Sequence, residues 1–236
     1  MSTAPIMLKR MTTMMIKRTL LFVVLATVCV SGFSQKDNFG IWYDISTEIK
    51  PIKKFELDLE ACLRTFDNAS RIEETFVEAG LSYKLNKYIS AGAAYRFTEN
   101  IEDDDSYHPR HKWFIDLKGS VPSGDFSFIA RIRYQTRYKT YYEDEDDKIP
   151  DSHIRGKFTI FYDIPSFHLN PYLGYELFTP VFNEPKRRID KNRFFLGAEY
   201  NLTKKHTVEA EYIFQRDYLP RLRDLNILSL QYKFKL

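Results

Sequence analysis

Basic and acidic side chains recur at every second position in several segments of this chain. Arg131, Arg133, Arg137 and Lys139 follow this spacing in one segment. Residues two apart in an extended strand project from the same face, so these cations would form a row. Such a row can bind anions, and when enclosed in a protein it must be paired with carboxylates. The residues expected to share one enclosed, charged face are Glu56, Asp58, Glu60, Arg64, Arg131, Arg133, Arg137, Glu209 and Glu211.

Two serines lie close in sequence to histidines, Ser106 to His108 and Ser152 to His153. A serine hydroxyl activated by an imidazole could hydrolyse a lipid ester, as a lipase or deacylase does. Both pairs, however, lie in acidic, loop-like surroundings where solvated polar residues are expected. The chain has no Gly-x-Ser-x-Gly motif, no glycine-rich phosphate loop, and no His-x-x-x-His or Cys-x-x-Cys spacing. We therefore predict no catalytic residue, metal or cofactor, and keep a lipid-modifying enzyme as an alternative.

Charged residues also gather in segments expected to be long loops. Clustered carboxylates could bind a divalent cation such as Ca²⁺, and basic residues could contact the phosphates of lipopolysaccharide. Neither acidic run has the spaced ligands and glycine of a calcium loop, so mutual pairing or plain solvation is the favoured interpretation. The possible cation ligands are Glu102, Asp103, Asp104, Asp105, Glu143, Asp144, Glu145, Asp146 and Asp147. The possible lipopolysaccharide contacts are Lys186, Arg187, Arg188, Arg221 and Arg223.

Strands must position these charges, and the end of the chain shows the required pattern. Leu228, Leu230, Tyr232, Phe234 and Leu236 would lie on one face of a strand, with polar or charged residues between them. Ten earlier segments alternate in the same way, over roughly the nine to eleven residues that a tilted strand needs to cross a bilayer. Their opposite faces mix charged residues with glycines, which suits a narrow polar lumen.

The connections between these segments are alternately short and long, as in residues 86–87 and then 98–110. This alternation, the apolar faces and the aromatic residues near segment ends favour a membrane barrel over a soluble sandwich or lipocalin-like barrel. We predict an all-β fold, a transmembrane antiparallel up-and-down β-barrel of about ten to twelve strands. Eleven segments are counted, but single-chain barrels of bacterial outer membranes have even strand numbers, so ten or twelve strands are expected.

Residues 1–34 have the composition of a secretory signal peptide. They contain four basic residues and no acidic residue, and an apolar run covers residues 19–30. Cleavage is expected before Gln35, which leaves residues 35–236 as a single barrel domain. The whole chain has 35 basic and 32 acidic residues, so no basic surplus points to nucleic acid.

Several strand and turn motifs resemble a known family. They are the segment around Trp42, the strand Leu59-Glu-Ala-Cys-Leu-Arg64, and the hairpin from Leu81-Ser-Tyr-Lys-Leu-Asn-Lys87 to Ala94-Tyr-Arg-Phe97. Together they resemble a family of secreted barrel proteins of unknown function, domain of unknown function 2490, over residues 39–236. The resemblance implies an outer-membrane barrel and does not imply a reaction.

The sequence therefore predicts an integral protein of the bacterial outer membrane that is not an enzyme. The lumen is expected to be filled by its own paired charges, which makes the protein structural or weakly pore-forming; a small-solute pore or transporter is the alternative. Its expected partners are outer-membrane lipid and lipopolysaccharide, together with the barrel-assembly machinery, which would bind the C-terminal strand.

Overall fold

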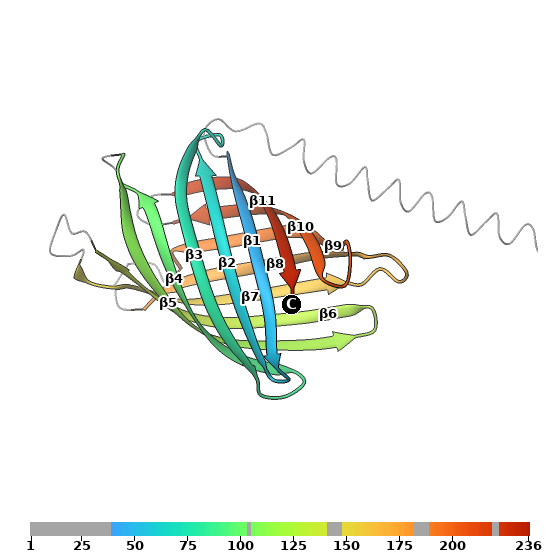
Figure 1. Ribbon diagram of the computed structural model, residues 1–236. Coiled ribbons are helices and arrows are strands. Elements are labelled where there is room, and N and C mark those ends of the chain that lie inside the picture. Colours follow the sequence, from blue (N-terminus) through green and yellow to red (C-terminus); the bar gives the residue numbers. More distant parts are fainter. Residues whose placement is uncertain (1–38, 103–104, 141–147, 182–188, 219–221) are drawn as a thin grey trace, which may run out of the picture. The chain divides into compact units, whose positions relative to one another are not determined.

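The computed structural model describes residues 39–102, 105–140, 148–181, 189–218 and 222–236. These residues form eleven strands (Figure 1). The strands are β1 (Phe39–Ile52), β2 (Phe55–Phe66), β3 (Arg71–Lys84), β4 (Ile89–Ile101), β5 (Tyr107–Ser123), β6 (Phe126–Lys139), β7 (Asp151–Tyr162), β8 (Leu169–Pro180), β9 (Lys191–Asn201), β10 (His206–Asp217) and β11 (Arg223–Lys235). The expected signal peptide lies outside the described residues.

No helix among the described residues has the length and apolar character that a membrane crossing requires.

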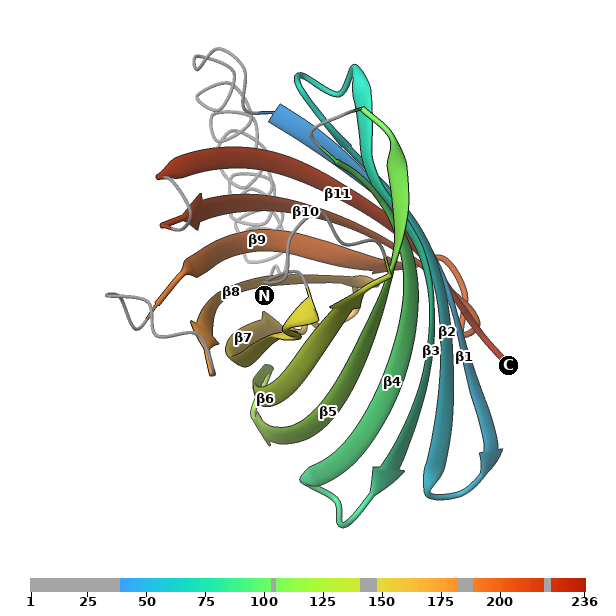
Figure 2. The ribbon, with the colours of Figure 1, turned by 90° about the vertical axis from the view of Figure 1, so that its left-hand side faces the viewer.

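The eleven strands close into a barrel. Each strand is hydrogen-bonded to its neighbours in the chain, and β1 is also paired with β11. In this closed order β7 is five strands away from both β1 and β2, so it lies on the opposite wall. Figure 2 shows β7 on the far side of the barrel from β1 and β2.

The closing pair corrects two expectations. The eleven segments counted in the sequence are the eleven strands, and the expectation of ten or twelve was wrong. An odd number of alternating strands leaves the first and last pointing the same way, so they can pair only in parallel. Phe39 accordingly lies opposite Asn226 and Glu48 opposite Lys235, in a parallel register. The barrel is therefore mixed rather than antiparallel throughout.

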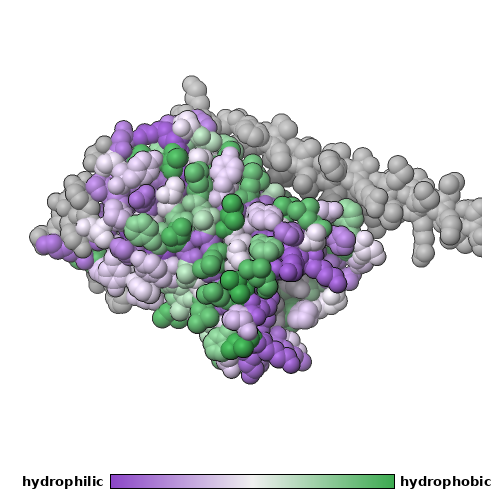
Figure 3. Space-filling view, in the orientation of Figure 1, coloured by the Kyte–Doolittle hydropathy of each residue, from purple (hydrophilic) through white to green (hydrophobic). Residues whose placement is uncertain are grey.

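The outer surface of the barrel carries large apolar side chains. Ile45, Ile115 and Ile132 are 63%, 64% and 60% exposed, and all belong to the apolar faces expected from the sequence. Figure 3 shows hydrophobic residues gathered over the middle of the face in view, with hydrophilic residues towards its edges. A soluble protein rarely exposes so continuous an apolar surface, because contact with water disfavours it.

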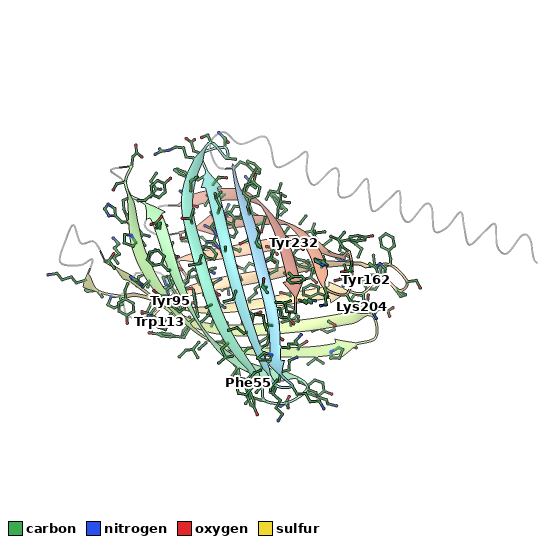
Figure 4. All side chains as sticks on the ribbon, in the orientation of Figure 1. Phe55, Tyr95, Trp113, Tyr162, Lys204 and Tyr232 are labelled. Atoms are coloured by element: carbon green, nitrogen blue, oxygen red, sulfur yellow. The ribbon has the colours of Figure 1, made fainter. Side chains whose placement is uncertain are left out.

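Aromatic side chains pair on this outer surface between neighbouring strands. The rings of Tyr95 and Trp113 lie 4.6 Å apart, centroid to centroid, and those of Phe126 and Tyr162 lie 5.0 Å apart. Figure 4 shows Tyr95 and Trp113 together on β4 and β5, with Phe55 near a short turn. Such rings suit the boundary between lipid and water, where they are enriched in membrane barrels.

Two glycines on the inner face make room for aromatic rings, not for the long charged side chains expected from the sequence. A Cβ atom on Gly174 would lie 2.4 Å from the ring of Phe195 and 2.5 Å from the carbonyl oxygen of Phe158. A Cβ atom on Gly197 would lie 2.6 Å from the hydroxyl of Tyr172. These two positions therefore exclude any larger residue unless the inner wall shifts.

Gly174→Ala is expected to destabilise the barrel by about 1–3 kcal/mol, because the added methyl group overpacks against Phe195 and the β7 backbone. Gly156→Ala is the matched control, since a Cβ atom there meets nothing within 4 Å. Urea unfolding of the purified protein in detergent micelles measures both free energies. Equal unfolding midpoints for the two variants would show that the close contact at Gly174 is unimportant.

Candidate functional site

The inner faces of the strands enclose a cavity of about 770 Å³ that is lined largely by charged side chains. Seven of the nine residues expected on the charged face line it: Glu60, Arg64, Arg131, Arg133, Arg137, Glu209 and Glu211. Glu56 and Asp58 lie on the same face of β2 but nearer the short turn, where Glu56 approaches Lys50 (3.5 Å) and Lys84 (3.9 Å). All nine residues therefore lie on inward-facing positions of their strands, seven of them around the cavity.

The basic row of β6 is paired with carboxylates, but not with those expected from the sequence. Arg133 donates two hydrogen bonds of 2.6 Å to Asp116, which lies directly opposite it on β5. Arg137 donates to Asp151 at 2.6 Å, where β6 and β7 are also in register. The carboxylates expected to face this row were Glu56, Asp58, Glu60, Glu209 and Glu211. Alternation shows which face of a strand a charge occupies, but it does not show the register between strands, so the partners could not be identified.

Glu176 is the centre of the largest ion-pair cluster described in the cavity. Its carboxylate lies 2.8 Å from Arg155, 3.1 Å from Arg131 and 3.7 Å from Arg193. Arg155 also donates to the side-chain oxygen of Gln135 and Arg193 to that of Gln215, at 2.9 and 2.7 Å. One carboxylate therefore serves three guanidinium groups, which leaves this part of the lumen with an excess of positive charge.

Aromatic rings support these cations from the same inner faces. Arg133 lies 4.4 Å from the ring centroid of Phe114, and Arg155 lies 4.4 Å from that of Phe178. Lys157 lies 4.1 Å from the ring of Phe195. A cation over a ring face is attracted by the ring quadrupole, most strongly where water is excluded. The rings therefore hold several lumen cations in place without neutralising their charge.

Sequence reasoning missed these inward rings and an apolar cluster beside them. The buried residues of the cluster are Trp42, Tyr172, Phe195, Ile213, Leu225 and Ile227. They come from β1 and from β8 to β11, so one side of the lumen is packed with apolar side chains. The available signal was a break in alternation, since Ile227 and Leu228 are adjacent and a strand with both faces apolar must be covered on both sides.

The acidic residues of β10 belong to a second network. Lys233 pairs with Glu209 at 2.6 Å and with Glu199 at 2.9 Å. The hydroxyl of Tyr172 lies within hydrogen-bonding distance of carboxylate oxygens of both Glu211 (2.8 Å) and Glu209, and its single proton is shared between them. Lys233 lies between Tyr232 and Phe234 on β11, and its partner Glu209 lines the cavity, so Lys233 is on the lumen side of the strand.

The two serine–histidine pairs behave differently. Ser106 Oγ lies 2.5 Å from His108 Nε2, within hydrogen-bonding distance. Ser152 Oγ instead donates to Thr136 at 2.9 Å, while His153 Nε2 lies 2.5 Å from Asp190. Adjacent residues of a strand project from opposite faces, so Ser152 and His153 cannot act as a pair.

The candidate residues of the long loops are described only in part. Glu102 pairs with Arg110, and Asp105 pairs with Arg71. Arg223 approaches Asp217 (3.7 Å) and lines the cavity, so it faces the lumen and not the surrounding lipid. The remaining candidates, Asp103, Asp104, Glu143, Asp144, Glu145, Asp146, Asp147, Lys186, Arg187, Arg188 and Arg221, lie outside the described residues.

Three carboxylates near the short turns, those of Glu48, Glu56 and Asp58, have oxygen atoms within 4.8 Å of one another. Lys50 contacts both Glu48 and Glu56 and offsets part of their charge. The sequence predicted no metal site, and these three residues were not considered there as ligands. Their spacing permits a bound cation without requiring one.

Comparisons with known proteins agree with the barrel fold. A family model described as "Protein of unknown function (DUF2490)" matches residues 39–226. The curated proteins contain no match. Among solved structures, NanC porin in a rhombohedral crystal form is 16% identical with a TM-score of 0.53, and the match covers 86% of this chain and all of that one. At this level of identity the similarity shows a shared fold and nothing more.

Two larger proteins give weaker matches. The anion-selective porin from Comamonas acidovorans is 12% identical with a TM-score of 0.39, over 78% of this chain and 54% of that one. OccK11 (OpdR) from Pseudomonas aeruginosa is 13% identical with a TM-score of 0.36, over 72% of this chain and 52% of that one. This chain thus spans about half the length of either.

Asp116→Ala is expected to destabilise the protein by about 3–5 kcal/mol, because Arg133 would remain in the lumen without its carboxylate. Lys118→Ala, two positions along the same strand and exposed, should change stability by less than about 0.5 kcal/mol. Urea unfolding in micelles again measures the difference. If Asp116→Ala proved as mild as the control, the pairing of lumen charges would not be a condition of stability.

Proposed function

This chain belongs to the DUF2490 family of proteins of unknown function, and we propose that it is a pore for small hydrophilic solutes in the bacterial outer membrane. The observation that carries the proposal is the cavity of about 770 Å³, lined by charged side chains, inside a closed barrel with an apolar outer surface. Lipid can solvate such an exterior, and only water or polar solutes can occupy such an interior.

Strand length supports a membrane position. The strands contain 11 to 17 residues, which is at least the length of roughly nine to eleven that a tilted strand needs to cross a bilayer. The closed sheet also satisfies the backbone hydrogen bonds that an open edge would leave unpaired in lipid. Outer-membrane lipid is then the medium around the barrel, and β11 is the strand that we propose the barrel-assembly machinery binds.

A purely structural barrel with a filled lumen was the favoured interpretation of the sequence. Two features of the lumen now favour a pore. Register pairs the charges of neighbouring strands along the wall, as with Arg133 and Asp116, and the cavity of about 770 Å³ lies among these side chains. Glu176 and its three cations likewise come from β6 to β9, on one side of the barrel.

The full chain, reconstituted into planar bilayers, is expected to give discrete conductance steps. Arg155→Gln removes one cation from the wall with the positive excess and should shift the reversal potential in a KCl gradient towards cation selectivity. Lys87→Gln changes an exposed residue in the short connection between β3 and β4, outside the cavity lining, and should leave the reversal potential unchanged. Bilayers that stay silent with folded protein would contradict the pore.

A second candidate function is lipid hydrolysis, favoured by the 2.5 Å contact between Ser106 and His108. The pore proposal predicts that purified protein releases no fatty acid from phospholipid or lipopolysaccharide. It also predicts that Ser106→Ala leaves bilayer conductance unchanged. Fatty-acid release that disappears in Ser106→Ala would establish the enzyme instead.

A further inference from the structure

We propose that the lumen favours small zwitterionic solutes, whose ammonium and carboxylate groups pair with opposite walls of the barrel. The inference rests on the proposed pore function and names the class of solute that the pore admits best. It is carried by the charges that remain after the ion pairs of the lumen have formed. One wall retains carboxylates without cations, and the facing wall retains cations in excess.

The acidic wall is formed by Asp44 on β1 and Glu60 on β2, which both line the cavity. Neither makes a salt bridge with any residue that the structure describes. Asp44 accepts a long hydrogen bond of 3.4 Å from Ser229. The two cations that attract the Glu60 carboxylate most strongly are already engaged, Arg96 with Glu78 at 2.6 Å and Arg64 with Glu74 at 3.0 Å.

The basic wall is formed by Lys157 on β7 with the three arginines around Glu176. The ammonium group of Lys157 lies over the ring of Phe195 and forms no salt bridge within the described part of the chain. Glu211 and Glu176 are the carboxylates that attract it most strongly, and each already has other partners. Lys157 therefore presents a positive charge to the lumen.

The two walls face each other. β7 is five strands from β1 and five from β2 in the closed order, and Figure 2 shows it across the barrel from both. Glu60 and Lys157 each lie near the middle of their strands, and both line the same cavity. Charges of opposite sign on facing walls, in a narrow passage with an apolar exterior, produce a field across the passage.

Such a field distinguishes solutes by their charge distribution. A simple anion is attracted to the wall of Lys157 and repelled by Asp44 and Glu60, and a simple cation meets the reverse. An uncharged solute gains nothing from the field. A zwitterion can turn so that its carboxylate faces Lys157 and its ammonium group faces Asp44 and Glu60, so both walls attract it.

Swelling of proteoliposomes containing the full chain measures which solute enters fastest. The probes are L-threonine, erythritol and threonate, which are zwitterionic, uncharged and anionic on the same four-carbon skeleton. L-Threonine is expected to enter about three- to tenfold faster than erythritol, the range that two exposed ion pairs provide.

Glu60→Gln and Lys157→Gln should each bring the threonine-to-erythritol ratio close to one. Lys157→Arg keeps the charge and should retain the preference. Lys87→Gln, in the exposed short connection between β3 and β4 and outside the cavity lining, is the matched control and should behave as the unmodified protein does. Heat-modifiable migration on gels establishes that each variant is folded before its rate is compared.

Each alternative outcome has a separate meaning. Equal entry of threonine and erythritol through the unmodified protein would overturn the zwitterion preference while leaving the pore intact. Threonate entering fastest would overturn it in favour of an anion site. No swelling with any of the three solutes would overturn the pore itself, and the preference with it.

Discussion

The parallel pairing of β1 with β11 is the contact on which the rest of the structure depends. A sheet with open edges exposes unpaired backbone groups, and a lipid environment offers them no hydrogen-bonding partners. Closing the edges fixes a distinct inside and outside for every strand. From that point alternation determines the rest, because each apolar residue facing outwards brings its charged neighbours into a shared interior.

The charged side chains of that interior then have to be stabilised. Carboxylates and guanidinium groups removed from bulk water must be paired, hydrogen-bonded or supported by aromatic rings. Register brings Asp116 to Arg133 on adjacent strands, while Glu176 binds three arginines and rings such as Phe114 support cations from below. Many of these partners belong to neighbouring strands, so the ion pairs run along the wall around the cavity.

The sequence predicted the barrel, its eleven segments and the face of nearly every charge, since all three depend on local alternation. It did not predict the parallel closure, because the odd count of eleven was set aside in favour of the even strand numbers usual in bacterial outer-membrane barrels. It did not predict the partners of Arg131, Arg133 and Arg137, because register is not visible in one strand. The inward Phe114, Phe178 and Phe195 were missed for a related reason. An aromatic residue at an inner position breaks the alternation of apolar and polar residues. Its role becomes clear only when the structure shows the cation that lies over its ring.

The central claim is that the paired charges leave a continuous passage through the barrel. The most direct test is the rate at which uncharged polyols of increasing size swell proteoliposomes containing the folded full chain. A continuous passage predicts rapid entry of glycerol, a steep decline in rate as the polyols lengthen, and no entry into liposomes without protein. Liposomes containing folded protein that exclude glycerol as completely as empty ones would contradict it.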